Sequence, residues 1–186
     1  MVEKGCFDVF SKLMQDRVVF LNQEINADSA SQIVASLIWL DKQSSNSEIT
    51  LLINSIGGSI EDGLFSIYDT LQIIKAPVKT ICIGEAYSGA AIILAAGTKG
   101  SRFAYPNSKI MIHGVQAGLP EGSITQLEQE QLKIKILNLS IMKILAKHTK
   151  KPLKRLKQDC QYDKYFTPTE AIKYGLIDGI IKPSKI

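Results

Sequence analysis

The sequence predicts one α/β domain built on a largely parallel sheet. Short runs rich in β-branched residues alternate with segments whose apolar residues recur at helical spacing, which is the pattern of βαβ units. No low-complexity segment or long linker interrupts the 186 residues. A chain of this length buries roughly 70% of the surface that its unfolded form exposes, so it needs neither disulfides nor a structural metal to hold a core. We therefore expect a single domain over residues 1–186.

Two helices are predicted between the first three of six strands. The strand candidates are 17–21, 48–54, 78–84, 102–105, 109–113 and 179–182. The first helix covers 28–43, and Asp28 or Ser29 can cap its start. The second helix covers 60–75, where apolar residues recur every three or four positions.

A much longer helix is predicted over 122–148, with apolar residues on more than one face. One side carries Ile124, Leu127, Leu132, Ile136 and Leu139, and another carries Ile134, Leu137, Ile141 and Leu145. A helix of ~27 residues is ~40 Å long, which exceeds what a domain of this size covers. We expect part of it to meet another subunit in a homo-oligomer. The alternative is a helix buried wholly in the core.

A short helix near the C-terminus is marked at both ends. Thr167 can cap it, Pro168 suits its first position and Glu170 completes a capping box. Gly175 can end it.

Composition narrows the function classes. The chain has 22 basic and 18 acidic residues, two histidines and three scattered cysteines, Cys6, Cys82 and Cys160. It contains no CxxC pair and no Cys/His cluster with zinc spacing, so we expect no metal and a reducing, cytoplasmic location. No signal peptide is visible, and the longest apolar run, 90–97, is far shorter than the ~20 residues that span a bilayer. We therefore expect no membrane association.

Seven basic residues between 143 and 157 raise the possibility of nucleic-acid binding. No aromatic residue is interleaved among them to stack on bases. The segment is therefore interpreted as a solvated helix surface, and no nucleic-acid partner is expected.

Two strand-to-helix turns can hold a developing anion. The first contains Gly57 and Gly58, where a sharp turn can expose backbone N–H groups, although it lacks the lysine and the spacing of a phosphate loop. The second places Ser88 before an apolar helix at 90–96, where unpaired amides favour negative charge. A nucleophile fits this position, and so does an ordinary N-cap. The GxSxG spacing is absent because Ala86 replaces its first glycine.

A serine nucleophile needs a base, and only two histidines are present. His148 ends the long helix, where a histidine that binds the last carbonyls is the ordinary interpretation. His113 follows an apolar strand, at the sheet edge where α/β sites form, and is the better candidate. Asp163 is one of eighteen carboxylates that could orient the imidazole, and its position alone does not single it out.

From Cys6 to Ile181 the residues resemble the ClpP family, the proteolytic subunits of the Clp protease. Several separate motifs match in the right order. They are Leu52-Ile53-Asn54-Ser55 with Gly57-Gly58-Ser59, Ile67-Tyr68-Asp69-Thr70, AAGTKGSRFAYPNSKIMIH at 95–113, the segment 144–149, and 165–181 with Tyr174-Gly175-Leu176-Ile177-Asp178.

The resemblance implies a ClpP/crotonase-like fold of repeated ββα/βαβ units and a serine endopeptidase. Ser88 matches the nucleophile, His113 the general base and Asp163 the acid that orients it. The backbone amides of Gly58 and Gly89 match the oxyanion hole. Residues 1–16 would form the N-terminal segment and first helix, and 115–148 the protruding handle region.

The resemblance also implies an assembly. Two stacked heptameric rings form a tetradecamer that encloses the active sites and degrades unfolded polypeptides. A partner AAA+ Clp ATPase unfolds and threads the substrates and uses the ATP, so this chain needs no cofactor.

Several residues depart from the family pattern around the site. Gly89 stands where methionine usually follows the nucleophile, and Ile56 replaces a proline in the glycine turn. Gly114-Val115 replaces the Gln-Pro that commonly follows the histidine. Ahead of Asp163, Gln161 and Tyr162 replace an Asp-Arg pair that bridges the rings.

These departures leave alternatives to the active peptidase. One is a weakly active or inactive ClpP paralogue that acts as a structural subunit of a mixed ring with a second, active paralogue. Another is a crotonase-type acyl-CoA enzyme that uses the glycine turn as its oxyanion hole.

Overall fold

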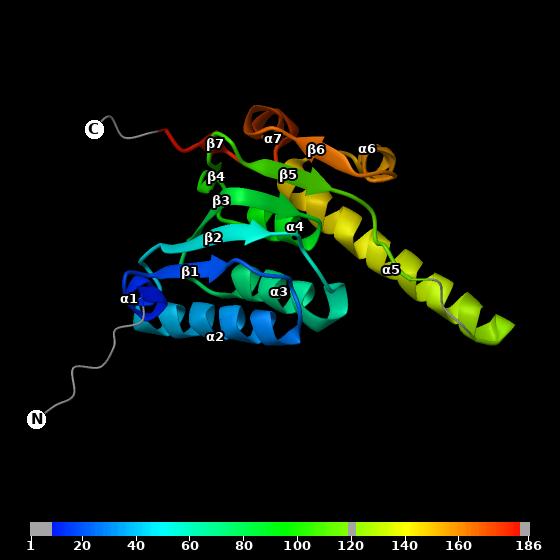
Figure 1. Ribbon diagram of the computed structural model, residues 1–186, viewed down its shortest axis with the longest axis horizontal. Helices are drawn as coiled ribbons and strands as arrows, with labels where there is room; N and C mark the ends of the chain where they lie inside the picture. The colour runs from blue at the N-terminus through cyan, green and yellow to red at the C-terminus, as the bar shows by residue number, and fades with distance from the viewer. Residues whose placement is uncertain (1–8, 119–121, 183–186) are drawn as a thin grey trace, which may run out of the picture.

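A parallel sheet forms the centre of the molecule in the computed structural model, which describes residues 9–118 and 122–182. Its strands run in the order β1-β2-β3-β4-β7, and every pair along this path is parallel. Their bounds are β1 Val18–Leu21, β2 Ile49–Ser55, β3 Val78–Tyr87, β4 Arg102–Ala104 and β7 Gly179–Ile180. The parallel α/β architecture predicted from the alternating pattern is confirmed (Figure 1).

Two further strands extend the sheet beside the carboxyl half of β3. The strand β5, Lys109–Ile112, pairs with β3 in parallel, and β6, Lys164–Phe166, pairs with β5 antiparallel. The strand β6 was not predicted, because three residues do not show a period. Its pairing brings the chain after residue 160 next to the end of β5.

Helices cover the sheet and hold its core. The bounds are α1 Val9–Gln15, α2 Ala27–Gln43, α3 Phe65–Ile73, α4 Gly89–Ala95, α6 Leu153–Asp159 and α7 Pro168–Tyr174. Buried apolar residues of α2, α3 and α4 pack with those of β1, β2 and β3 in one cluster. The helix α1 falls within the predicted segment 1–16, of which residues 1–8 lie outside the described part. The predicted caps of α7, Thr167 and Gly175, are confirmed.

Two local predictions were wrong. The cap of α2 is Asn26 rather than Asp28 or Ser29, because Asn26 Oδ1 accepts a hydrogen bond from the Ser29 amide while the Ser29 hydroxyl binds the Asn26 amide. The segment predicted as one helix over 60–75 opens instead with a π-helical turn, η1 Ile60–Leu64. Gly63 lets this wide turn press against the chain at Ile25, where a Cβ would stand 2.7 Å from the Ile25 Cγ2.

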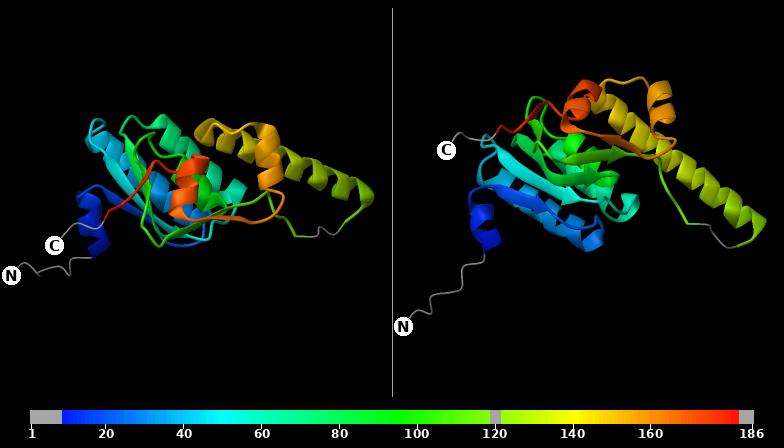
Figure 2. Two further views of the ribbon diagram at one scale, coloured as in Figure 1. Left: turned by 90° about the horizontal axis from the view of Figure 1, so that it is seen from above. Right: turned by 45° about the horizontal axis from the view of Figure 1, so that its top comes forward.

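The long helix α5, Ile124–Thr149, extends well beyond the body of the molecule (Figure 2). Its C-terminal half is anchored by the buried residues Ile141, Met142 and Leu145. Its outer half exposes apolar residues of the first predicted side, and Ile136 is 57% exposed. The alternative of a wholly internal helix is therefore excluded.

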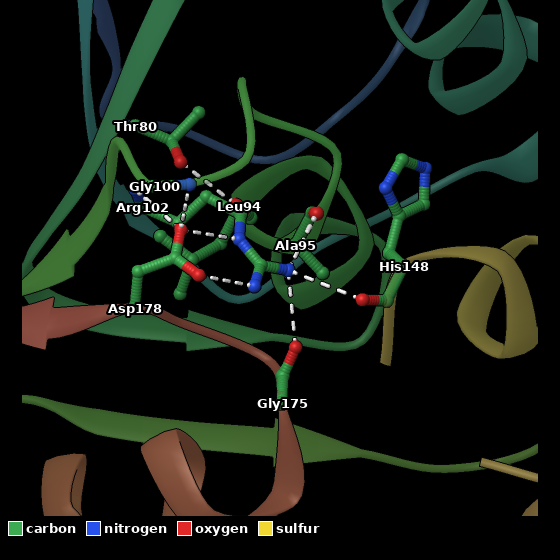
Figure 3. Close-up of polar contacts among 8 residues, drawn as sticks. All are labelled: Thr80, Leu94, Ala95, Gly100, Arg102, His148, Gly175 and Asp178. Carbon is green, nitrogen blue, oxygen red and sulfur yellow. Dashed lines mark hydrogen bonds and ion pairs between the residues drawn. The ribbon is translucent and has the colours of Figure 1, made fainter. Parts of the chain in front are cut away.

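A buried arginine ties three parts of the fold together at the other end of α5 (Figure 3). The Arg102 guanidinium donates to both carboxylate oxygens of Asp178, at 2.6 and 2.8 Å. It also donates to the carbonyls of Ala95, Gly175 and His148. Burial on its own would raise the pKa of Asp178, but the hydrogen bonds and charge of Arg102 lower it below its usual value.

Among the described residues, no helix combines the length and apolar character needed to cross a lipid bilayer.

Candidate active site

Ser88 lies at the sharp turn between β3 and α4. The strand ends at Tyr87 and the helix begins at Gly89, so Ser88 alone makes the change of direction. Its backbone has φ +53° and ψ −123°, a conformation that non-glycine residues rarely adopt. Its hydroxyl does not cap α4. Ser88 therefore occupies the N-cap position of α4, as one interpretation predicted, but its side chain makes no capping hydrogen bond and is available for another role.

The side chain of Ser88 contacts the ring of His113. His113 directly follows β5, and Ser88 and β5 are neighbours because the Ser88 amide donates to the Met111 carbonyl at 2.9 Å. The Nε2 atom of His113 lies 2.7 Å from the Ser88 Oγ. This distance is within the range over which a base accepts a hydroxyl proton.

Asp163 stands on the far side of the ring, in the loop between α6 and β6. Its Oδ1 lies 3.2 Å from the His113 Nδ1, close enough for an ion pair. The oxygen is not in line with the ring N–H, however, and within the described part of the chain Nδ1 makes no hydrogen bond. The Asp163 side chain is 44% exposed, against 15% for His113. The fold thus brings Ser88, His113 and Asp163 together, but the Asp163 carboxylate is not aligned for a hydrogen bond with the His113 ring.

The glycine turn packs directly against this group. Gly57 and Gly58 have φ of +93° and +149°, and a Cβ at position 57 would stand 2.7 Å from the Ser88 Cβ. A Cβ at position 58 would overlap the Ile25 carbonyl. Only glycine fits these positions, since the conformation and the close approach both exclude a side chain.

The amides near the serine differ in their hydrogen bonding. The Gly57 N–H donates to the Ser55 Oγ at 3.1 Å. Within the described ranges, the N–H groups of Gly58 and Gly89 have no acceptor. Gly89 is also the first residue of α4, where the helix dipole favours negative charge. Both amides are therefore free to donate to an oxyanion.

A cavity of about 410 Å³ opens beside Ser88 and His113. Its apolar lining comes from the glycine turn, η1, α4, β5 and α5. The large apolar residues are Ile56, Ile60, Leu64, Ile92, Met111, Val115, Ile134, Leu137 and Ile141. Three of them, Ile134, Leu137 and Ile141, belong to the second apolar face of the long helix. That face was visible in the sequence, but its role in the site was not.

His148 is not part of this group. Its Nε2 lies 3.2 Å from the Tyr68 hydroxyl, and the two rings meet edge to face. The expectation that its ring binds the last carbonyls of the helix was wrong, because the ring turns toward α3 instead. Burial lowers the pKa of His148 to about 4, and the charges of Lys147 and Arg102 act in the same direction.

One polar residue near the site was missed by sequence reasoning. The Oδ1 of Asn138, on α5, accepts a hydrogen bond from the Val115 amide at 3.1 Å, two residues after His113. A single asparagine in a helix of 26 residues carries no pattern that could have pointed to this contact.

Comparisons with known proteins show what the whole chain is similar to. The family model described as Clp protease matches residues 2–184 of the chain. The chain is also similar to the ATP-dependent Clp protease proteolytic subunit of Deinococcus radiodurans. The two are 42% identical over 179 residues, which are 96% of this chain and 87% of the relative.

Proposed function

The chain belongs to the Clp protease family, and we propose that its peptidase activity rests on Ser88, His113 and Asp163. As a Clp-type serine protease subunit it hydrolyses peptide bonds. The observation that carries the proposal is the 2.7 Å contact between the Ser88 Oγ and the His113 Nε2. The free amides of Gly58 and Gly89, and the cavity that both residues line together with Ser88, support it.

The reaction proceeds through an acyl-enzyme. The Ser88 Oγ attacks the carbonyl carbon while the His113 Nε2 takes the hydroxyl proton. The oxyanion that forms accepts hydrogen bonds from the amides of Gly58 and Gly89, and Asp163 stabilises the imidazolium by its charge. His113 then protonates the leaving amine as the C–N bond breaks. Water, deprotonated by the same nitrogen, hydrolyses the ester and restores Ser88.

The lining of the cavity favours apolar peptide segments. Its wall beside the serine is built mainly from isoleucine and leucine, so burying an apolar substrate side chain there is favourable by roughly 25 cal/mol per Å² of surface removed from water. Unfolded polypeptides expose many more such side chains than folded proteins do. This supports unfolded polypeptides as the substrate class.

The exposed half of α5 supports an assembly of copies of this chain. Several large apolar side chains are exposed along this projecting helix, and burying them against another subunit is favourable. We propose two stacked heptameric rings, a tetradecamer, served by an AAA+ Clp ATPase that unfolds substrates and uses the ATP. The chain itself then requires no cofactor or metal and acts in the cytoplasm, without nucleic-acid or membrane partners.

Active-site labelling tests this function. Intact protein, under conditions that favour assembly, should react with a fluorophosphonate at Ser88 and cleave short peptides with an apolar residue before the scissile bond. Ser88→Ala should do neither, whereas Ser31→Ala, a matched change on the exposed face of α2, should do both. Absence of labelling and of cleavage in the wild-type protein would contradict the proposal.

A second candidate is a weakly active or inactive subunit of a mixed ring with another ClpP paralogue. The His113 Nδ1, which makes no hydrogen bond within the described residues, favours it, because an unaligned imidazole is a poorer base. Purifying the protein and measuring its peptidase activity distinguishes the two candidate functions. Homomeric rings with full peptidase activity support the first candidate, and activity that appears only after mixing with the paralogue supports the second.

A further inference from the structure

The backbone that follows His113 is held by two hydrogen bonds to two different elements. The Gly114 amide donates to the Cys160 carbonyl at 2.8 Å, at the end of α6. The next amide, that of Val115, donates to the Oδ1 of Asn138 at 3.1 Å, on α5. The strand β5 ends at Ile112, so these two amides lie beyond the sheet and bond to helices instead of to a strand.

Both acceptors approach residue 114 closely. A Cβ at this position would stand 3.1 Å from the Cys160 carbonyl oxygen and 3.3 Å from the Asn138 Oδ1. A side chain would therefore push against both hydrogen-bond partners at once. The absence of a side chain at Gly114 thus leaves room for the Asn138 Oδ1 to approach and accept the hydrogen bond from the Val115 N–H.

This segment forms one wall of the catalytic cavity. Residues 113–117 all line it. Within the described part of the chain, residues 114–118 take part in no hydrogen bonds besides these two. The direction in which the chain leaves His113 therefore depends on the Cys160 carbonyl and on Asn138.

We infer that Asn138 is a positioning residue for the catalytic histidine. It acts through the Val115 amide, and so fixes the backbone from which the His113 ring reaches the Ser88 Oγ. The inference rests on the function proposed above. Without the Asn138 oxygen, the Val115 N–H loses its partner in a partly buried place, and the wall can move relative to the serine.

The first test compares two substitutions at this position. Asn138→Leu keeps the size of the side chain but removes the acceptor, and we expect kcat for a short peptide to fall about tenfold, the effect of one lost hydrogen bond. Asn138→Asp keeps an oxygen acceptor, so kcat should return to within about twofold of the wild-type value. Gln158→Leu, an amide-to-leucine change on the exposed face of α6, serves as the control and should leave kcat unchanged.

The second test separates positioning from fold stability and from peptide binding. The rate at which a small fluorophosphonate labels Ser88 depends on the Ser88–His113 pair and hardly on peptide binding in the cavity. It should fall by about the same factor as kcat in Asn138→Leu, while the melting temperature and the size of the assembly stay near their wild-type values. If Asn138→Leu does not assemble, Asn138→Ala, which suits a helix best, carries the same comparison.

Several outcomes would overturn the inference. One is a wild-type labelling rate in a folded, assembled Asn138→Leu protein. Another is an equal loss in Asn138→Leu and Asn138→Asp. Failure of both acceptor-free variants to fold would assign Asn138 a purely structural role. A wild-type protein that neither labels nor cleaves peptides would instead refute the proposed function, so the two failures are distinguishable.

Discussion

The Asp163 Oδ1 stands 3.2 Å from the His113 Nδ1, yet this nitrogen makes no hydrogen bond with any described residue. The other ring nitrogen lies 2.7 Å from the Ser88 Oγ. If Nε2 accepts the serine proton, Nδ1 must carry the hydrogen, and a carboxylate off its line stabilises the imidazolium by charge more than by orientation. In free enzymes such contacts are often loose and tighten when substrate binds.

Replacing the Asp163 carboxylate should therefore lower kcat less than the same change does in a triad whose hydrogen bonds are aligned. We expect Asp163→Asn to lower kcat by about 10²-fold, against roughly 10⁴-fold where the hydrogen bond is fully formed. Peptide cleavage followed over time gives the measurement. Asp28→Asn, an exposed carboxylate in the first turn of α2, is the control. A loss as large as that of Ser88→Ala would show that the aspartate is aligned in the working enzyme.

The two glycines at positions 57 and 100 offer a matched pair. Their φ values are +93° and +91°, but a Cβ at position 57 meets Ser88 and Tyr87, whereas one at position 100 meets nothing within 4 Å. Both Gly→Ala variants should lose about 1–2 kcal/mol of stability through the left-handed backbone, and Gly57→Ala should lose more because its Cβ also meets close neighbours. Only Gly57→Ala should also lose peptidase activity, by tenfold or more. Equal activities in the two variants would contradict the role of the glycine turn.

Much of the fold was predictable because its signals are local. The strands of the parallel sheet are rich in β-branched residues, and the amphipathic helices show a clear period. The strand β6 was missed because its three residues are held by pairing with β5, which no local pattern shows. The π turn at 60–64 was missed because apolar residues at 60, 64, 67 and 71 also fit an α-helix.

The site was predictable only in part, because some of its contacts depend on tertiary structure and not on a local sequence pattern. Residue chemistry indicated Ser88 and His113, and the family resemblance added Asp163, Gly58 and Gly89. The alignment of the His113 Nδ1 and the contact between Asn138 and Val115 depend on tertiary geometry. Neither a polar residue at an unremarkable helix position nor a carboxylate out of line with a ring N–H leaves a trace in the sequence.

Arg102 should be among the residues least tolerant of change. Arg102 is 5% exposed and serves Asp178 and three carbonyls, so Arg102→Met should lower the free energy of unfolding by about 3–5 kcal/mol. Arg102→Lys should be intermediate, because an ammonium keeps the charge but not the planar fork. Urea unfolding measures both. Arg155→Lys changes an exposed arginine whose partner, the buried side chain of Asp159, also binds Lys164 and Tyr174, so it should leave the midpoint nearly unchanged. A loss similar to that of Arg102→Met would contradict this account.

The exposed half of α5 should control assembly. Ile136→Asp puts a charge into the apolar surface that we propose another subunit covers, and it should shift the protein from rings toward smaller species. Mass photometry or analytical ultracentrifugation measures the distribution. Ile73→Asp, on the exposed end of α3, is the matched control for adding the same charge elsewhere. Unchanged rings with Ile136→Asp would remove this surface from the assembly.

His148 should make the fold sensitive to mild acid. The unfolded chain takes up a proton near pH 6.5, whereas burial holds the folded pKa at about 4. Between these values protons bind the unfolded state better, so the contribution is complete above pH 6.5 and is lost as the pH falls toward 4. Allowing for the partial exposure of the ring, this amounts to about 1–2 kcal/mol. His148→Gln, which keeps a polar partner for Tyr68, should lose correspondingly less stability between pH 6.5 and 4 in urea unfolding; parallel curves for the two proteins would mean that His148 is as easily protonated in the fold as in the unfolded chain.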